Sequence, residues 1–279
     1  QAESNRLNIY LYGLSSNEMP QLRAEYNYQG GYRDGRLKAG QLIVVSQDNL
    51  NINRNLEQSS MYSQSNCRNI QKPFIDSFDL TITQIHSIQL NTLSDSTTSQ
   101  VGAVEQIYMG ESLYLVRAGT SSREWFYWDD RLRLGETDFD KAIVAKYSLD
   151  LDDEVTLTHA GQVKGQIYSQ WAMKEDRERD LFFVTTTVDE IQSGGFLGGT
   201  INQGIRYNQL WALGEGEPND LVIKGVSNPF GKTEDIRAVR YIGDMAYVVT
   251  FKKTDPVFAI NLKNLPKLSI EGELHIPGF

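Results

Sequence analysis

The amino-acid sequence predicts an all-β fold made of similar units that follow one another along the chain. The first observation is a short apolar phrase that ends in valine and recurs four times, at Val45, Val116, Val184 and Val249. The copies lie roughly 70 residues apart, and such a regular interval indicates an array of equivalent units. The second observation is that strand-like segments alternate with turns, while no long helical period interrupts them.

The valine phrase is the first element to identify in each unit. Its copies occupy residues 39–46, 110–117, 180–185 and 243–250, and they are rich in Val, Ile, Tyr and Phe. A short run of consecutive apolar residues of this kind is typical of a strand that is buried on both faces. Before three of the copies an alternating segment predicts a neighbouring strand, at 104–109, 165–171 and 236–242.

Two further strands are predicted after the valine phrase. The third strand of a unit is expected at 79–90, 142–149, 208–213 and 257–262, and the fourth at 158–163, 222–226 and 269–274. Gly110 and the pair Gly243-Asp244 supply the tight turns that hairpins need. Each unit is therefore predicted to be a four-stranded antiparallel meander.

Four-stranded meanders in series predict a β-propeller. The expected fold class is all-β, with about four four-stranded blades that form either a complete propeller or an incomplete one. Residues 1–279 are expected to be a single propeller domain or a propeller fragment. A β-sandwich also contains many short strands, but it does not predict a phrase that recurs at a near-constant interval.

Three long insertions separate the second and third strands of the first three units. They are expected at 47–77, 118–141 and 187–207, whereas the last unit needs only a short link. In a propeller these connections emerge on one face, and long irregular connections are usually functional or mobile. The sequence therefore predicts that any ligand binds at this face.

The composition excludes several classes of protein. The 27 basic and 36 acidic residues give a net charge of -9 and a pI of about 4.9, so a nucleic-acid partner is not expected. No stretch approaches the roughly 18 apolar residues of a membrane helix. Cys67 is the only cysteine, which excludes an internal disulfide. The chain begins at Gln1 without a methionine and is read as a mature or trimmed protein.

The C-terminal segments resemble a known family. The run 234–251, the segment 254–262 and the end 272–279 together are similar to secreted prokaryotic proteins that have a C-terminal β-propeller domain. Residues 161–165 and 169–175 resemble another segment of that family, and the matches are dense from about residue 142 onward. The resemblance implies a propeller in a secreted or periplasmic protein, and it implies no reaction, cofactor or site residue.

The resemblance also bears on partners. Family members continue beyond the position of Phe279, so the chain is expected to stop at a blade boundary. An unclosed blade exposes strand edges, which predicts self-association through an open edge. A glycan or protein partner is expected at the long-loop face.

The densest aromatic cluster is the candidate ligand-binding site. It comprises Trp125, Tyr127, Trp128, Asp129 and Asp130 within the second insertion. Aromatic rings beside carboxylates suit a sugar, because the rings stack on C–H surfaces while the acids accept bonds from hydroxyls. The alternative is that these rings pack the insertion back onto its own blade.

Other candidate sites are weaker. Asp150, Asp152 and Glu154 alternate as calcium ligands sometimes do, but a solvated turn explains them as well. The three histidines lie in different units with no metal-ligand spacing, and no nucleophile, phosphate-loop or dinucleotide motif is present. No catalytic residue, metal or cofactor is therefore assigned.

Three functions stay open at this point. The first is an exported, non-catalytic propeller that binds a glycan or a protein through its long-loop face. The second is a carbohydrate-active hydrolase or lyase that uses carboxylates in a central funnel. The third is a structural module that docks another part of a longer protein.

Overall fold

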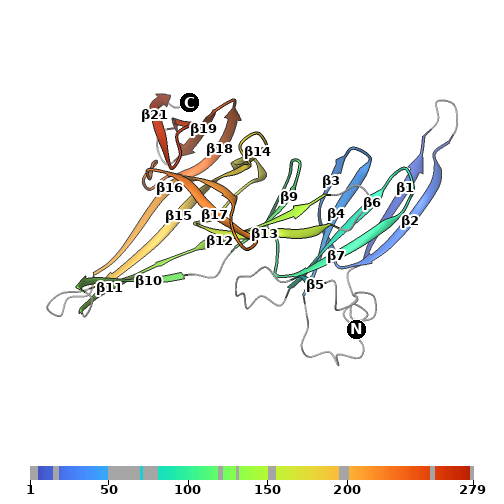
Figure 1. Ribbon diagram of the computed structural model, residues 1–279, viewed down its shortest axis with the longest axis horizontal. Helices are drawn as coiled ribbons and strands as arrows, with labels where there is room; N and C mark the ends of the chain where they lie inside the picture. The colour runs from blue at the N-terminus through green and yellow to red at the C-terminus, as the bar shows by residue number, and fades with distance from the viewer. Residues whose placement is uncertain are drawn as a thin grey trace. The chain divides into compact units, whose positions relative to one another are not determined.

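The computed structural model describes residues 6–14, 19–49, 70–71, 81–118, 122–129, 132–149, 155–194, 201–251 and 255–276. Within these residues the chain is all-β and contains no α-helix, as Figure 1 shows, which confirms the predicted fold class. The chain divides into two compact units. Unit 1 holds residues 1–104 and 147–157, and unit 2 holds residues 105–146 and 158–279.

Unit 1 contains a hairpin and a four-stranded meander. The hairpin pairs β1 (Arg6–Gly13) with β2 (Gln21–Gln29) as a sheet of its own. The meander runs through β3 (Gly31–Lys38), β4 (Gln41–Asn49), β6 (Thr81–Gln89) and β7 (Asp95–Val101). The short strand β5 (Ile70–Gln71) lies parallel to β7.

The first meander of unit 2 has an inserted hairpin. Its strands are β8 (Gln106–Met109), β9 (Leu113–Ala118), β12 (Lys141–Ser148) and β13 (Thr156–Lys164), in that order across the sheet. Between β9 and β12 the chain forms β10 (Ser122–Asp129) and β11 (Leu132–Phe139), which pair with each other.

Two more meanders complete unit 2. The first consists of β14 (Met173–Asp176), β15 (Leu181–Gly194), β16 (Ile201–Glu215) and β17 (Asp220–Ser227). The second consists of β18 (Asp235–Ile242), β19 (Met245–Phe251), β20 (Asp255–Asn261) and β21 (Lys267–Ile276). Short parallel pairings join the fourth strands, β13 to β17 and β17 to β21.

The predicted strand positions are confirmed with one exception, but β19 is not buried on both faces as expected, because its residues alternate between buried and exposed. The segment 165–171 was expected to be the first strand of its meander, but β14 begins only at Met173, after a 3₁₀ turn at Gln170–Ala172. Gly165 causes the difference, because its φ of +89° makes a turn there. A Cβ at Gly165 would lie 2.4 Å from the Thr187 carbonyl oxygen, so this close approach requires glycine.

Two of the expected insertions contain paired strand where irregular loop was expected. Residues 187–207 largely continue β15 and β16, whose register runs from Leu181↔Gly214 to Gly194↔Ile201. Residues 118–141 contain the β10–β11 hairpin, and β11 pairs with β15. The result is a sheet in the order β10-β11-β15-β16. In the insertion 47–77, the structure describes only 47–49, which end β4, and β5.

Aromatic and aliphatic side chains form the core of unit 2. Tyr114 of β9 stacks on Phe182 of β15 at 3.7 Å between ring centroids, and Phe183 is fully buried. Leu213 and Ile260 bring the third strands of two meanders into the same cluster. Burial of each such side chain contributes about 1.5–3 kcal/mol, so this core fixes the meanders of unit 2 against one another.

A carboxylate adds a polar clamp at the edge of this core. Glu175 on β14 accepts hydrogen bonds from the backbone N–H of Glu111 and Ser112, in the turn between β8 and β9. The Tyr114 hydroxyl donates to the same carboxylate at 3.1 Å. This clamp ties the first meander of unit 2 to the second.

Candidate ligand-binding site

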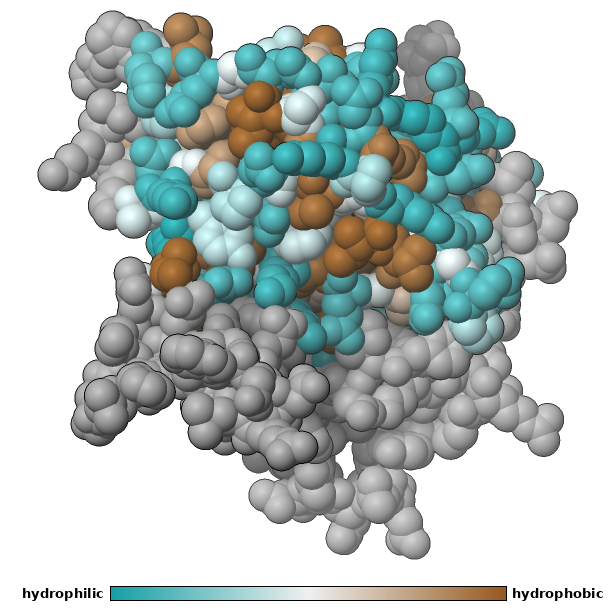
Figure 2. Space-filling model, turned by 60° about the vertical axis from the view of Figure 1, so that its left-hand side comes forward, coloured by the Kyte–Doolittle hydropathy of each residue, from teal (hydrophilic) through white to brown (hydrophobic). Residues whose placement is uncertain are grey.

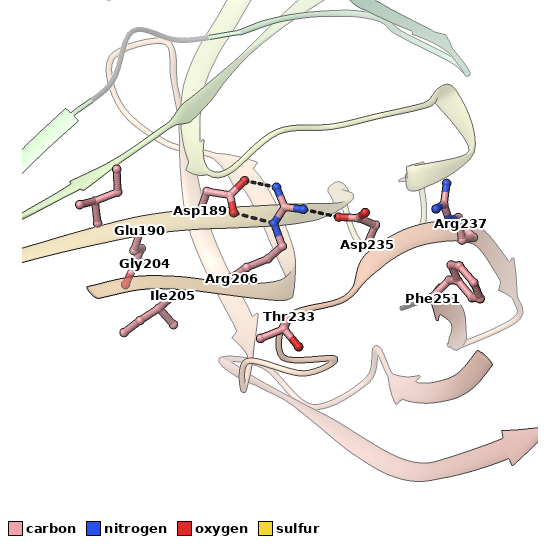
Figure 3. Close-up of a pocket in the computed structure, with 10 residues that line it drawn as sticks. Asp189, Glu190, Gly204, Ile205, Arg206, Thr233, Asp235, Arg237 and Phe251 are labelled. Atoms are coloured by element: carbon pink, nitrogen blue, oxygen red, sulfur yellow. Dashed lines mark hydrogen bonds and ion pairs between the residues drawn. The ribbon is translucent and has the colours of Figure 1, made fainter. Parts of the chain in front are cut away.

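A pocket of about 700 Å³ opens on unit 2, between the long β15–β16 hairpin and the start of the last meander. The chain reaches it from four places, which are the middle of β15, the facing part of β16, the turn and first residues of β18, and the last residue of β19. Figure 3 shows the side chains that line it, which are Asp189, Glu190, Ile191, Gly204, Ile205, Arg206, Thr233, Asp235, Arg237 and Phe251.

Arg206 lies at the centre of the pocket and binds two carboxylates. Its Nε and Nη2 donate to the two oxygens of Asp189 at 2.6 and 2.7 Å, while Nη1 donates to Asp235 at 2.6 Å. The three side chains are 39%, 44% and 43% exposed, respectively, so the network is open to solvent. Hydrogen bonding to Asp189 is the largest cause that raises the pKa of Arg206. A bidentate pair with a further acceptor fixes the guanidinium plane.

Strand register places this network. Asp189 and Arg206 are directly opposite each other on β15 and β16, so their side chains project from the same face. Asp235 opens β18 in the next meander, and the Thr233 amide donates to the Arg206 carbonyl at 2.9 Å. Beneath them the buried Asn208 donates to the carbonyls of Gly231 and Glu234. The turn that carries Asp235 is therefore held in place by backbone and buried side-chain bonds.

A second arginine and an aromatic ring form one wall. The Arg237 guanidinium lies over the Phe251 ring at 5.4 Å from its centroid. Phe251 ends β19 directly opposite Asp235, which places the ring next to the carboxylate network. Ile205 and Ile191 add apolar surface from the β15–β16 hairpin, and Ile191 is half exposed. The pocket thus combines apolar walls with a charged floor.

Glu190 adds a polar group to the pocket, and Tyr168, which is outside the lining, interacts electrostatically with the network. Burial is the largest cause that raises the pKa of Tyr168, and nearby carboxylates add to it while Arg206 acts in the opposite direction. The phenol therefore stays protonated at neutral pH and can donate a hydrogen bond. Glu190 accepts from the Tyr207 hydroxyl at 2.7 Å and lies 3.8 Å from the Lys164 ammonium.

The arrangement is suited to recognition of hydroxyl groups. The carboxylates of Asp189 and Asp235 have lone pairs beyond those given to Arg206, and the guanidinium has N–H donors to spare. A hydroxyl is both a donor and an acceptor, so it satisfies both kinds of group. Within the described residues no three His, Cys, Asp or Glu side chains gather as a metal site.

The sequence-predicted aromatic site lies on the same sheet as this pocket. Strand β10 contains Trp125, Tyr127, Trp128 and Asp129, and the structure describes only their backbone. Asp130 lies outside the described residues. Trp125 of β10 is opposite Glu136 of β11, and Glu136 is in turn opposite Ser193 of β15. Ser193 is three residues after Glu190 on β15. With strands about 4.8 Å apart, β10 lies about 10 Å across the sheet from β15.

A second polar cluster lies in unit 1 and is closed to solvent. His86 on β6 is fully buried, with Nε2 2.9 Å from Ser46 Oγ and Nδ1 2.9 Å from Thr97 Oγ1. Ser46 donates to the Gln29 carbonyl, so its hydroxyl proton is not directed at the imidazole. The Tyr28 ring stacks on His86 at 3.7 Å. Despite the Ser–His contact, this cluster is a packed interior and not a nucleophile site.

The other two histidines each lie beside a carboxylate. His159 Nδ1 lies 3.6 Å from a carboxylate oxygen of Glu215, and His275 Nε2 lies 3.0 Å from one of Glu273. His159 is on β13 and His275 is on β21. Asp150, Asp152 and Glu154 fall outside the described residues.

The pocket residues were missed at the level of sequence because residues 187–207 were read as an irregular insertion. Read as a hairpin, with the two glycine pairs of 194–199 at its tip, the same residues place Asp189 opposite Arg206. Opposite charges at equal distances from a glycine-rich turn are the signal that would have found the pair.

One face of the molecule mixes apolar and polar groups. On the described part of the face drawn in Figure 2, apolar side chains are interspersed with polar ones rather than gathered into a single patch. Among the described residues no helix has the length and apolar character to span a membrane.

Comparison with known proteins supports the architecture. Residues 1–279 match the family described as Beta propeller domain. An uncharacterized protein of Archaeoglobus fulgidus is 30% identical over 190 residues, which cover 65% of this chain and 26% of that protein. An uncharacterized protein of Methanocaldococcus jannaschii is 32% identical over 142 residues, which cover 51% of this chain and 20% of that protein.

The two alignments cover about a quarter and a fifth of the relatives' own lengths, while the family match extends along the whole chain. The meanders of both units and the absence of α-helix in the described residues agree with that match. The chain belongs to the β-propeller domain family.

Proposed function

We propose that this chain is an exported, non-catalytic β-propeller module that binds a glycan in the pocket around Arg206. The observation that carries the proposal is the open Asp189–Arg206–Asp235 network beside an aromatic wall. Export is supported by the resemblance of the C-terminal half to secreted propeller proteins and by the single cysteine, Cys67.

Preorganisation supports a sugar ligand. The three side chains of the network hold one another in place, so less side-chain freedom is lost when a ligand binds. Phe251 and Ile205 offer apolar surface for the C–H faces of a sugar ring, while the floor exchanges hydrogen bonds with its hydroxyls. These two kinds of contact together are what an oligosaccharide requires.

The charge balance supports a neutral glycan. Asp189, Glu190 and Asp235 oppose Arg206 and Arg237, so the pocket has nearly balanced charges. The whole chain has a net charge of -9, which disfavours a polyanion at low ionic strength. A neutral, hydroxyl-rich ligand is not repelled by the net negative charge, and it brings no unbalanced charge into the pocket.

A longer glycan has a path along the same sheet. The strand that contains Trp125, Tyr127, Trp128 and Asp129, with Asp130 following it, lies two strands away from Glu190. Its aromatic composition suits further sugar rings, so we expect oligosaccharides to bind more tightly than monosaccharides.

The test is a glycan array with a variant that fills the pocket. A Cβ on Gly204 meets no atom within 4 Å, so Gly204→Trp places an indole in the pocket without disturbing the fold. Gly272 on β21 is equally unobstructed and does not line the pocket, so Gly272→Trp is the matched control.

The proposal expects array signals for the unmodified chain that persist in Gly272→Trp and are lost in Gly204→Trp. A blank array with the unmodified chain, or equal signals from both variants, contradicts it. If acidic or basic peptides bind the pocket while no glycan does, the ligand is a protein and the glycan proposal is wrong.

A carbohydrate-active enzyme is the second candidate, since carboxylates from two meanders, Asp189 and Asp235, meet in one pocket. Each carboxylate already accepts a hydrogen bond from Arg206. A glycosidase needs one of its two carboxyl groups protonated as the general acid, and protonation would weaken the ion pair with Arg206. Release of reducing ends from polysaccharides, abolished by Asp235→Asn, would favour this function. No release by either form would exclude it for the substrates used.

A further inference from the structure

The hairpin at the start of unit 1 has an edge that nothing in the described residues pairs. β1 pairs with β2 on one side, and these two strands form a sheet by themselves, as Figure 1 shows. Two-stranded hairpins are marginally stable in water unless a further strand or a packed face supports them. The hairpin is anchored on the β2 side, where the Tyr28 ring stacks on His86 and Tyr26 donates to the Leu93 carbonyl. The outer edge of β1 has no comparable support within the described residues.

Three other edge strands of the described residues, β3, β14 and β18, are protected in ways that β1 is not. Charged side chains and a local bulge are the usual means by which proteins block edge pairing. β3 and β18 have both features, with register shifts at Tyr32/Asp34 and Ile236/Ala238. β14 is short and charged. β1 is eight residues long, and no charged residue follows Arg6 within it. The irregularity in its pairing skips Arg23, so it falls on β2.

We propose that the outer edge of β1 pairs antiparallel with β1 of a second copy of this chain. The two hairpins then form a continuous sheet in the order β2-β1-β1-β2 about a two-fold axis. The four-stranded sheet buries the outer β1 edge of each copy, so neither unprotected edge remains. The proposal is independent of the glycan pocket, since β1 belongs to unit 1 and the pocket to unit 2.

The composition of β1 is self-complementary in one register. If Ile9 lies on the two-fold axis, Leu7 faces Leu11 of the second copy, and Asn8 faces its Tyr10. Apolar residues then share one face of the sheet, because antiparallel pairing about Ile9 matches odd positions with odd positions. Arg6 faces Tyr12 of the second copy, so no two like charges are opposed and a cation–π contact is available. Tyr10 and Tyr12 are 47% and 55% exposed, so both are accessible.

The test is the oligomeric state across a wide range of protein concentration, measured by size-exclusion chromatography with light scattering. The unmodified chain is expected to show a concentration-dependent dimer. Tyr12→Lys places a lysine opposite Arg6 at both symmetric positions and is expected to raise the dissociation constant roughly tenfold. Leu37→Lys puts the same charge on a position of β3 that is also more than half exposed, and it serves as the control.

A charge exchange tests the register itself. Arg6→Glu combined with Tyr12→Lys restores opposite charges across the interface and is expected to recover the dimer. Hydrogen exchange gives a second readout, since the outward amides of residues 7–11 should be protected in the dimer and exposed in Tyr12→Lys. A chain that stays monomeric, or a dimer that Tyr12→Lys and Leu37→Lys weaken equally, overturns the proposal.

Discussion

The two units each contain a polar network, and the comparison of the two separates structure from function. In unit 1, His86 is fully buried and bonded on both nitrogens, to Ser46 and Thr97. In unit 2, Arg206 is also bonded on several nitrogens, yet more than a third of its side chain is exposed in a pocket. Both networks are hydrogen-bonded internally, but only that of unit 2 has donors, acceptors and exposed surface left for a ligand.

The difference teaches that residue type alone does not mark a site. A serine beside a histidine suggests catalysis. In unit 1, however, the Tyr28 ring packs on His86, and the hydroxyl proton of Ser46 is directed at a backbone carbonyl. An arginine between two aspartates suggests a surface ion-pair network, which by itself stabilises little. Accessibility and the neighbouring Phe251 wall make the second network the candidate site.

The largest expected effect comes from breaking the closed network. His86→Ala removes a buried ring and leaves Ser46 and Thr97 without their partner, so we expect a loss of about 2–4 kcal/mol in the free energy of unfolding. Urea unfolding followed by circular dichroism measures it. His275→Ala, on an exposed side chain of β21, is the control and should change little. Equal effects of the two substitutions would contradict the comparison.

The closed network also predicts a pH dependence. Burial lowers the pKa of His86 from 6.5 to about 3, so the unfolded chain binds more protons than the folded chain between these values. Stability should therefore rise with pH from about 3 to about 6.5 and then level off, with a slope from this group of at most about 1.4 kcal/mol per pH unit.

His86→Gln isolates this contribution, because its amide can also bond Ser46 and Thr97 but does not titrate. The difference between the two unfolding curves should shrink as the pH falls toward 3. A constant difference at every pH would show that His86 is not the group responsible.

The open network predicts a smaller change in stability and a larger change in binding. Arg206→Lys keeps the positive charge but cannot bond both oxygens of Asp189 and also Asp235, so we expect a loss of about 1 kcal/mol in stability. Glycan signals on the array should fall by more than this loss of stability explains. A variant that keeps full binding would show that the guanidinium fork is not part of the site.

The smallest expected effect is at an exposed contact away from the pocket. Arg240 lies over Trp171 at 5.0 Å from its centroid, and Trp171 is more than half exposed. Arg240→Ala should lower stability by about 0.5 kcal/mol and leave glycan binding unchanged. A loss of binding in this variant would mean that the site extends beyond the pocket defined here.

Much of the fold follows from the sequence because strand patterns are local. The valine phrase around Val116 and the third strand after it show their burial directly in consecutive apolar residues, whereas β19 around Val249 alternates between buried and exposed residues. The exception at 165–171 arose because an alternating pattern there belongs to a turn, where Gly165 must adopt a positive φ against Thr187. Whether the meanders close into a ring, and with how many blades, remains a prediction.

The candidate site followed much less from the sequence, because it depends on pairing between distant residues. Asp189 and Arg206 are neighbours only when the β15–β16 register is known, and Asp235 joins them from another meander. The aromatic residues of β10 were visible at once because they are consecutive. Their role as ligand contacts stays a prediction, since their side chains lie outside the described residues.

The central claim is that ligand binding occurs at the open network of unit 2. The most direct measurement is NMR of the arginine Nε–H signals while the strongest-binding oligosaccharide from the array is added. Arg179 is the internal reference, because it is likewise bonded to Asp176 and to the Leu262 carbonyl but does not line the pocket. We expect the Arg206 signal to shift in proportion to binding while that of Arg179 stays constant. A constant Arg206 signal during saturable binding would contradict it.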